Sequence, residues 1–344
     1  MNRGIPYALT AAALFGASTP FAKILVGQIP PVMLAGLLYL GSGLGLGAWL
    51  LLRMRQPTAG LTAADGPWLA GAILCGGVAG PVLLMLGIAL TPASTASLLL
   101  NMEGVLTALL AWFVFKESFD RRILIGMLLI VLAGGLLSWE QRPQLGAPWG
   151  ALATVAACLC WAIDNNLTRK ISAGDAVQIA AFKGMAAALV NLSLAWMLGA
   201  NLPAPGPLLA AGLIGLCGYG LSLVLFVLAL RHLGAARTGA YFSAAPFVGA
   251  MMSIVLLHDT PSPVFYFSGL LMGLGIWLHI SERHGHLHHH AATTHTHEHS
   301  HDAHHQHVHE FPCDQEQSHS HPHRHDALSH SHEHFPDIHH RHPH

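Results

Sequence analysis

Four ionisable side chains lie inside long apolar stretches of the sequence, at Lys23, Glu103, Asp164 and Lys183. A charged group at the centre of a lipid bilayer costs at least about 2.5 kcal/mol, so each is a candidate for ion binding, proton transfer or substrate recognition. Glu103 lies eleven residues after Pro92, which is about 16 Å along a helix and too deep for a short side chain to reach the membrane surface. We expect it to face a polar cavity, where its carboxylate can take up a proton or bind a cationic group of a substrate. A fixed ion pair with Lys183 is the alternative.

Asp164 begins an Asp-Asn-Asn string about one turn before the end of an apolar segment. Side chains four positions apart stack on one face of a helix, so Asp164 and Thr168 share a face. If that face lines the cavity, Asp164 and Asn165 offer acceptors and amide donors to an amphipathic substrate. Otherwise they belong to a solvated helix end or form hydrogen bonds between helices. Lys183 can neutralise Asp164, Glu103 or a carboxylate of the substrate.

Other polar and aromatic side chains in the apolar segments are weaker candidates for the cavity. Asn101 and Trp161 are included in the predicted substrate-binding or coupling set, and Asn191 and Tyr241 are possible additions. Tryptophan and tyrosine are more often packing or interfacial residues than ligand contacts in membrane helices. Lys23 lies near a helix end, where its amine can reach the membrane surface along its flexible stem.

Long apolar segments must position these residues. The sequence is 53% hydrophobic and 10% charged, against roughly 25% charged in a typical soluble domain. Ten segments are long and apolar enough to span a bilayer, which needs about 20 residues for a helix. They cover residues 5–27, 31–52, 67–90, 92–115, 122–139, 148–168, 176–199, 207–230, 236–257 and 263–281.

The positive charges predict how these helices are oriented. Lys and Arg gather at cytoplasmic helix ends. With a cytoplasmic N-terminus, eleven of them fall on the inner side, and the outer loops hold only Arg142. The eleven are Arg3, Arg53, Arg55, Lys116, Arg121, Arg122, Arg169, Lys170, Arg231, Arg237 and Arg283. The sequence therefore predicts a multi-pass membrane protein with both termini in the cytoplasm.

Two segments of the first half of the chain align with segments of the second half. Residues 94–117 align with residues 236–259, and residues 13–23 align with residues 159–169. Each half holds five predicted helices, and an odd number requires the second copy to be inserted upside down relative to the first. The predicted fold is an all-α membrane protein whose ten transmembrane helices form two inverted five-helix repeats.

The sequence resembles the EamA-type permeases of the drug/metabolite transporter superfamily. The resemblance rests on Phe15-Gly16-Ala17-Ser18 with Lys23, on Trp161-Ala162-Ile163-Asp164 with Arg169, and on the acids Glu117 and Asp259 that end the fourth helix of each half. It divides the chain into one EamA-like repeat at residues 1–142 and a second at residues 143–283. The resemblance implies a carrier of small metabolites in the cell (inner) membrane, often an exporter, that works by alternating access without ATP. It does not name the substrate.

Several classes of function are disfavoured. The sequence has no Gly-x-Ser-x-Gly elbow, Walker loop or His-Glu-x-x-His motif, so we do not expect an enzyme. A net charge of −1 gives no basic field for nucleic acid. We expect no required cofactor, and the expected partners are a small-molecule substrate and the lipid bilayer. Both a monomer and a homodimer remain open.

Residues 284–344 form a histidine-rich tail. Three of the 27 histidines precede it, at His232, His258 and His279, which leaves 24 for the tail. With few apolar residues it is predicted to be disordered. Imidazole is a suitable ligand for Zn, Ni, Co and Cu. Because the histidines are so closely spaced, many equivalent sets of ligands are expected. The candidate metal ligands are His288, His289, His290, His295, His297, His299, His301, His304, His305, His307 and His309.

The role of the tail has several alternatives. It could collect a divalent metal from the cytosol for export by the membrane portion. It could sense metal or pH, because imidazoles with a pKa near 6.5 change charge between pH 7 and 6. It could also be a storage tract on a metabolite carrier, or make the protein a membrane-tethered metal buffer.

Overall fold

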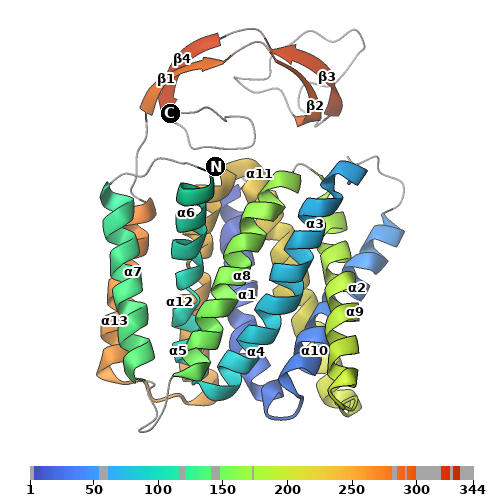
Figure 1. The fold of residues 1–344 in the computed structure, drawn as a ribbon, viewed down its shortest axis with the longest axis vertical. Helices are drawn as coiled ribbons and strands as arrows, with labels where there is room; N and C mark the ends of the chain where they lie inside the picture. The colour runs from blue at the N-terminus through green and yellow to red at the C-terminus, as the bar shows by residue number, and fades with distance from the viewer. Residues whose placement is uncertain are drawn as a thin grey trace.

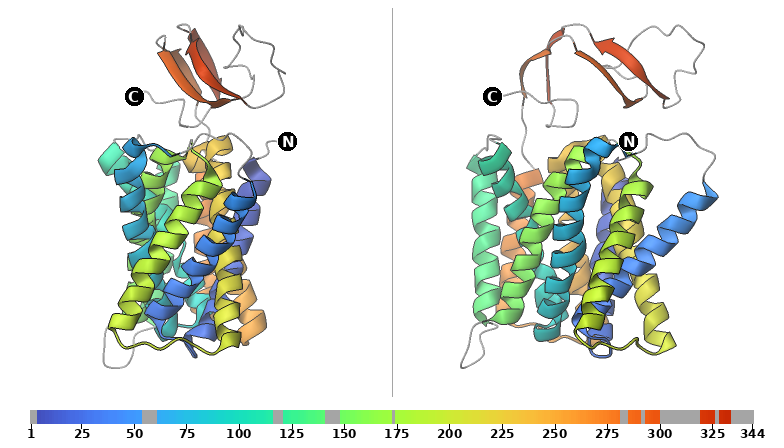
Figure 2. Two further views of the ribbon diagram at one scale, coloured as in Figure 1. Left: turned by 90° about the vertical axis from the view of Figure 1, so that its right-hand side faces the viewer. Right: turned by 45° about the vertical axis from the view of Figure 1, so that its right-hand side comes forward.

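The fold was analysed in a computed structural model. It describes residues 4–53, 61–115, 121–140, 148–172 and 174–280, together with tail segments 285–290, 293–299, 319–325 and 328–333. Helices that run roughly along a common axis form one bundle (Figures 1 and 2). In chain order the helices are α1 (Gly4–Val26), α2 (Pro31–Leu52), the 3₁₀-helix η1 (Ala63–Asp65), α3 (Gly66–Ala72), the π-helix η2 (Ile73–Ala79), α4 (Gly80–Leu90), α5 (Ala93–Leu99), α6 (Met102–Phe115), α7 (Arg121–Glu140), α8 (Trp149–Ile171), α9 (Ala176–Met197), α10 (Pro205–Ile214), the π-helix η3 (Gly215–Leu221), α11 (Ser222–Phe242), α12 (Ala245–Leu257) and α13 (Pro263–Ile280).

Six continuous helices of the described chain are long and apolar enough to cross a membrane. They are Gly4–Val26, Pro31–Leu52, Ala63–Leu90, Trp149–Ile171, Ala176–Met197 and Pro205–Leu233. Shorter apolar helices lie at Leu124–Leu137, Ala245–Leu257 and Pro263–Leu278. The predicted membrane-spanning, helical character is confirmed at this level for the described part of residues 5–281, and the number ten stays a prediction.

Two predicted boundaries differ from the structure. Residues 92–115 were predicted as one helix, but Leu100 and Asn101 separate α5 from α6. A break was predicted between residues 230 and 236, but α11 is continuous there and the interruption falls at Ser243 and Ala244. The polar residues of this region suggested a loop, yet polar side chains do not by themselves end a helix. Each interruption leaves a helix end inside the bundle.

The π-helices η2 and η3 occupy equivalent places in the two halves. Each has seven residues, and Ile73 and Gly215 are separated by 142 positions. The sequence alignment of residues 94–117 with residues 236–259 has the same offset of 142. Short π-segments inside helices are uncommon and are frequent at functional sites. Their matched positions indicate that the two halves share this local feature.

Small residues allow α2 and α9 to cross closely. A Cβ on Gly184 would lie 2.8 Å from the backbone nitrogen of Gly43, and a Cβ on Gly36 would lie 2.8 Å from Leu192. Close backbone approach of this kind is the usual basis of helix packing in membranes. Gly47, four residues from Gly43, has open space around it. Beside this crossing, the largest buried cluster includes Leu34, Leu38 and Ala188, so the core lies between the two halves.

The described tail segments form four strands outside the end of the bundle where the N-terminus lies (Figures 1 and 2). β1 (Gly285–His290) pairs with β4 (Leu328–Glu333), and β2 (Thr293–His299) pairs with β3 (His319–His325), both antiparallel. The sequence predicted disorder for the whole tail, and outside these segments disorder stays a prediction. In β2, β3 and β4 histidine alternates with other residues, and this period of two matches a strand.

The predicted metal ligands of the tail are distributed between two parts. His288, His289 and His290 belong to β1, and His295, His297 and His299 belong to β2. His301, His304, His305, His307 and His309 lie outside the described residues. Metal binding by the tail stays a prediction.

Candidate functional site

A cavity lies near the middle of the bundle between residues of both halves. It offers about 70 Å³ to the centres of water-sized molecules, and about 520 Å³ of space between atoms when its open mouth is included. Side chains from α1, α2, α6, α8, α9 and the η3–α11 segment line it. The lining residues are Phe15, Tyr39, Glu103, Trp161, Asp164, Asn165, Lys183, Gly218, Tyr219, Ser222, Leu223, Phe226 and Phe242.

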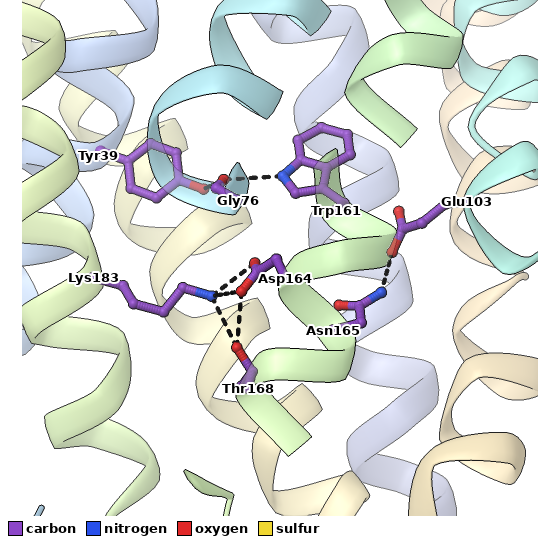
Figure 3. Close-up of polar contacts among 8 residues, drawn as sticks. All are labelled: Tyr39, Gly76, Glu103, Trp161, Asp164, Asn165, Thr168 and Lys183. Atoms are coloured by element: carbon purple, nitrogen blue, oxygen red, sulfur yellow. Dashed lines mark hydrogen bonds and ion pairs between the residues drawn. The ribbon is translucent and has the colours of Figure 1, made fainter. Parts of the chain in front are cut away.

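Lys183 and Asp164 form a buried ion pair on one wall of this cavity (Figure 3). The Lys183 Nζ lies 2.6 and 2.7 Å from the two carboxylate oxygens of Asp164, and 3.3 Å from the Thr168 hydroxyl oxygen. The Thr168 hydroxyl also donates to Asp164 Oδ1 over 2.8 Å. Lys183 is 1% exposed, so its ammonium depends on these three oxygens in place of water. The alternative pairing of Lys183 with Glu103 is not what the structure has.

Glu103 faces the cavity from the first turn of α6. Its Oε1 accepts a hydrogen bond from the Asn165 Nδ2 over 2.7 Å (Figure 3). The interruption at Leu100 and Asn101 places the N-terminus of α6 inside the bundle, and a helix N-terminus favours a negative charge. No Lys, Arg or His among the described residues forms an ion pair with Glu103. Its carboxylate is thus held by hydrogen bonding without a countercharge.

The π-helix η2 has backbone oxygens in the same region that accept hydrogen bonds from side chains. The amide of Gly80 bonds to the Cys75 oxygen, five residues back. Pro81 has no amide hydrogen, so it cannot pair with the Gly76 oxygen five residues back or with the Gly77 oxygen four back. The Gly76 oxygen instead accepts from the Tyr39 hydroxyl at 2.8 Å and from the Trp161 Nε1 at 3.0 Å (Figure 3).

The glycines of η2 also allow close contact with α8 and α9. A Cβ on Gly76 would collide with the Asp164 carboxylate. The Gly77 oxygen accepts from the Asn191 Nδ2 over 3.0 Å. The segment therefore holds Tyr39 and Trp161 through the Gly76 oxygen, and the missing side chain of Gly76 leaves room for the Asp164 carboxylate.

Aromatic rings cover much of the remaining cavity wall. The Phe15 ring lies 5.7 Å from Trp161, 5.9 Å from Tyr219 and 5.6 Å from Phe242, measured between centroids. Tyr39 and Tyr219 are 5.4 Å apart, and Phe226 and Phe242 are 4.8 Å apart. These separations are typical of edge-to-face and tilted aromatic pairs.

The structure brings together most of the predicted site residues. Glu103, Asp164, Lys183, Asn165 and Trp161 all line the cavity. Their roles in substrate binding or coupling stay predictions.

Asn101 is the exception in the predicted set. It is not among the lining residues, because its amide nitrogen donates to the Leu98 oxygen over 3.1 Å at the break between α5 and α6. Two weaker candidates also lie outside the lining set. Asn191 bonds to η2, and Tyr241 packs beside Ala8 and Leu233.

Lys23 is held at the opposite end of the bundle from the N-terminus. Its amine donates to the Ile88 oxygen and, over 3.0 Å, to the Thr91 oxygen at the end of α4. It therefore stabilises carbonyl groups that a helix C-terminus leaves unpaired.

Sequence reasoning missed the aromatic part of the lining. Tyr39, Tyr219, Phe226 and Phe242 were not predicted as site residues, and Phe15 entered only as part of a family motif. Aromatic residues are common in membrane helices for packing reasons, so composition gives no specific signal. The weak signal that existed is the equivalence of Phe15 and Trp161 in the alignment of residues 13–23 with residues 159–169.

The described residues contain no group of three or more His, Cys, Asp or Glu side chains that could hold a metal ion. In the cavity, the only acids lining it are Glu103 and Asp164, and Asp164 is already neutralised by Lys183.

Comparison with known proteins supports a transport function for this architecture. A relative from Methanothermobacter thermautotrophicus, described as an uncharacterized transporter, is 26% identical over 78% of this chain and 84% of its own length. The uncharacterized inner membrane transporter YedA of Escherichia coli K12 is 27% identical over 79% of this chain and 91% of its own length.

A solved structure described as a crystal structure of a protein shares the fold. It has a TM-score of 0.61 and 19% identity, and the match covers 80% of this chain and 94% of that chain. The sequence model of the EamA-like transporter family matches twice, at residues 2–139 and 148–281. This multi-pass membrane protein therefore belongs to the EamA-like transporter family.

Proposed function

We propose that the protein is a secondary carrier that moves a small organic metabolite through the cavity by alternating access. One observation carries the proposal: Glu103 faces the cavity from inside the bundle and forms no ion pair with the described residues. A carboxylate in this setting gains from binding either a proton or a cationic group. Binding and release of that positive charge couples the site to movement of the substrate.

Alternating access follows from an inverted repeat of the two halves. Two contacts related by the sequence alignments support this arrangement. Asp164 of α8 fits against Gly76 of η2, and Ser18 of α1 fits against Gly218 of η3. Gly218 is 142 positions after Gly76, and Asp164 is 146 positions after Ser18, which are the offsets of the two alignments. Each half thus contributes its first helix and its π-helix to this pair of equivalent contacts.

Export from the cytoplasm is the proposed direction, with both termini in the cytoplasm. The Lys and Arg distribution supports this orientation, and Figure 1 has the N-terminus and the tail strands at the same end of the bundle. Export of a divalent metal is less well supported, because the described residues contain no metal-ligand cluster.

The test is a comparison of Glu103→Gln with the wild-type protein in cells that lack the native gene. Glutamine keeps the hydrogen bond with Asn165 possible but cannot bind a proton or pair with a cation. We expect the difference in metabolites between cells with and without the protein to disappear in Glu103→Gln, at unchanged protein amount in the membrane. Asp65→Asn is the matched control, because Asp65 caps the surface helix η1 and lies away from the cavity. A wild-type metabolite difference in Glu103→Gln contradicts the proposal.

A further inference from the structure

We propose that the substrate is a small organic cation with a flat apolar body, bound by Glu103 and by the aromatic walls of the cavity. This inference rests on the proposed function and names its substrate class. It follows from the balance of charges, from the hydrogen-bond donors that are already used, and from the aromatic lining.

The charges of the lining residues leave one negative group to be compensated. The Lys183 ammonium and the Asp164 carboxylate neutralise one another at 2.6 Å. Glu103 then carries the remaining charge among the lining residues, because the other members of the set are neutral. In a site of low dielectric constant, an uncompensated carboxylate attracts a cation far more strongly than it does in water.

The hydrogen-bond donors of the cavity are mostly occupied by the protein itself. The Lys183 ammonium has three hydrogens and three oxygen partners, on Asp164 and Thr168. The Trp161 and Tyr39 donors are both used by the Gly76 oxygen. A ligand carboxylate or phosphate would therefore find no free cation in the lining set, and a sugar would find few donors.

The hydroxyl of Ser222 is also engaged. It donates to the Ala11 oxygen over 2.9 Å. The Tyr219 hydroxyl forms a side-chain hydrogen bond with Ser18, which leaves the second hydrogen of the Asn165 amide as a donor that a ligand can use. The donor inventory thus favours a ligand that itself donates hydrogen bonds, as an ammonium group does.

The aromatic groups suit the body of such a ligand. Phe15, Trp161, Tyr219, Phe226 and Phe242 surround the cavity. The polar atoms of Trp161 and Tyr39 are bonded to the Gly76 oxygen, so the rings of these two residues offer mainly apolar surface to the cavity. A cation near a ring face gains about 0.5–2 kcal/mol, in addition to the pairing with Glu103.

Three probes that share one indole body test the charge preference directly. Tryptamine is a cation at neutral pH, tryptophol is neutral, and indole-3-acetate is an anion. Binding of each is measured by calorimetry on the purified full chain, with a chelator present to keep metals off the tail. We expect tryptamine to bind at least about tenfold more tightly than tryptophol, equivalent to about 1.4 kcal/mol, and indole-3-acetate to bind more weakly than either.

Variants distinguish the contribution of the Glu103 carboxylate to binding from that of the aromatic walls. Glu103→Gln should remove the preference for tryptamine over tryptophol. Phe226→Leu should lower the affinity for both probes and keep the preference. Asp65→Asn should change neither. Equal or tighter binding of indole-3-acetate, no binding of tryptamine, or an unchanged preference in folded Glu103→Gln overturns the inference.

The outcome also distinguishes this inference from the carrier proposal. Loss of metabolite transport in Glu103→Gln together with preference for the anionic probe supports a carrier and overturns the cationic substrate. Tight tryptamine binding without any metabolite difference between wild-type and Glu103→Gln cells supports the cation site and overturns the carrier.

Discussion

Glu103 and Asp164 line one cavity but differ in what neutralises them. Asp164 contacts an ammonium with both oxygens, whereas Glu103 accepts one hydrogen bond from an amide. The difference arises because Lys183 and Thr168 lie on the Asp164 side, while α6 begins beside Asn165. We therefore expect Asp164 and Lys183 to act as a fixed structural pair, and Glu103 to be the group whose charge changes.

Lys183→Met should destabilise the protein strongly, because it leaves the Asp164 carboxylate buried without its cation. Removal of one partner of a buried ion pair costs about 3–5 kcal/mol. The double variant Asp164→Asn/Lys183→Met should recover most of this loss, because no unpaired charge remains. The measurement is the midpoint of thermal inactivation in detergent.

Arg53→Met provides the comparison for this prediction. The Arg53 side chain pairs with Asp175 at the end of the bundle and is 28% exposed, whereas the Asp175 side chain is 6% exposed. The Asp175 carboxylate also accepts hydrogen bonds from the Val177 and Gln178 amides, which remain when Arg53 is replaced. The midpoint of Arg53→Met should therefore fall less than that of Lys183→Met. If Lys183→Met and Arg53→Met shift the midpoint equally, the buried pair does not have the role assigned to it.

The sequence could identify the charged residues of the site but not their partners. Glu103, Asp164 and Lys183 are conspicuous because charges are costly in apolar helices. Whether Lys183 pairs with Asp164 or with Glu103 depends on how α6, α8 and α9 are rotated, which the sequence pattern does not determine. Tyr39 and Tyr219 were missed for a related reason, since a tyrosine can face lipid, core or cavity with the same sequence context.

The π-helix η2 is the element that most directly shapes the site. It combines a shift in backbone hydrogen bonding, the missing amide of Pro81, and glycines that let α8 approach. Hydrophobic periodicity cannot predict such a segment, because an apolar run reads as a helix whether its bonds span four or five residues. The equivalent run at η3 has Leu223 where η2 is followed by Pro81, so the sequence alone did not link the two.

Gly76→Ala should damage the site, because the added methyl group would occupy the space of the Asp164 carboxylate. The carboxylate would have to move away, which weakens its contact with Lys183 and disturbs Trp161 and Tyr39 on the Gly76 oxygen. We expect a loss of stability of about 1–3 kcal/mol, typical of overpacking, and a transport rate reduced at least about tenfold. Thermal inactivation and metabolite flux measure the two effects.

Gly47→Ala is the matched control for Gly76→Ala. Gly47 lies within α2 and a Cβ there meets nothing within 4 Å. Alanine favours a helix over glycine by about 1 kcal/mol, so this variant should be as stable as the wild-type protein or more so. A similar loss in both variants would show that glycine flexibility, not the contact with Asp164, is what matters at Gly76.

The positions of the helices in the bundle could be predicted from the sequence better than any other feature of this protein. Predicted segments such as 31–52 and 176–199 agree with α2 and α9 to within two residues at each end, because apolar length is a direct physical requirement of the bilayer. The breaks at Leu100 and Ser243 were not predicted, since they are made by local backbone geometry and not by a polar loop. The strands of the tail were missed because a histidine-rich composition was read as unable to fold.

The membrane portion should transport its substrate without the tail. The described membrane helices contain the buried clusters, and every residue that lines the cavity lies between Phe15 and Phe242. Removal of residues 284–344 should therefore leave metabolite transport within about twofold of the wild-type rate and keep its sensitivity to Glu103→Gln. Zinc binding by the purified protein should fall sharply, because 24 histidines are removed and imidazole is a good zinc ligand.

A fluorescent protein fused after residue 283 serves as the control for protein amount and for orientation in the same experiment. It should fluoresce, because the positive charges predict a cytoplasmic C-terminus, where such a reporter folds, whereas a periplasmic phosphatase fused at the same point should be inactive. The opposite reporter pattern contradicts the orientation and, with it, the proposed direction of transport. Loss of transport in a truncated protein that is present at the wild-type amount contradicts the separation, and would mean that the tail takes part in the transport cycle of the helices.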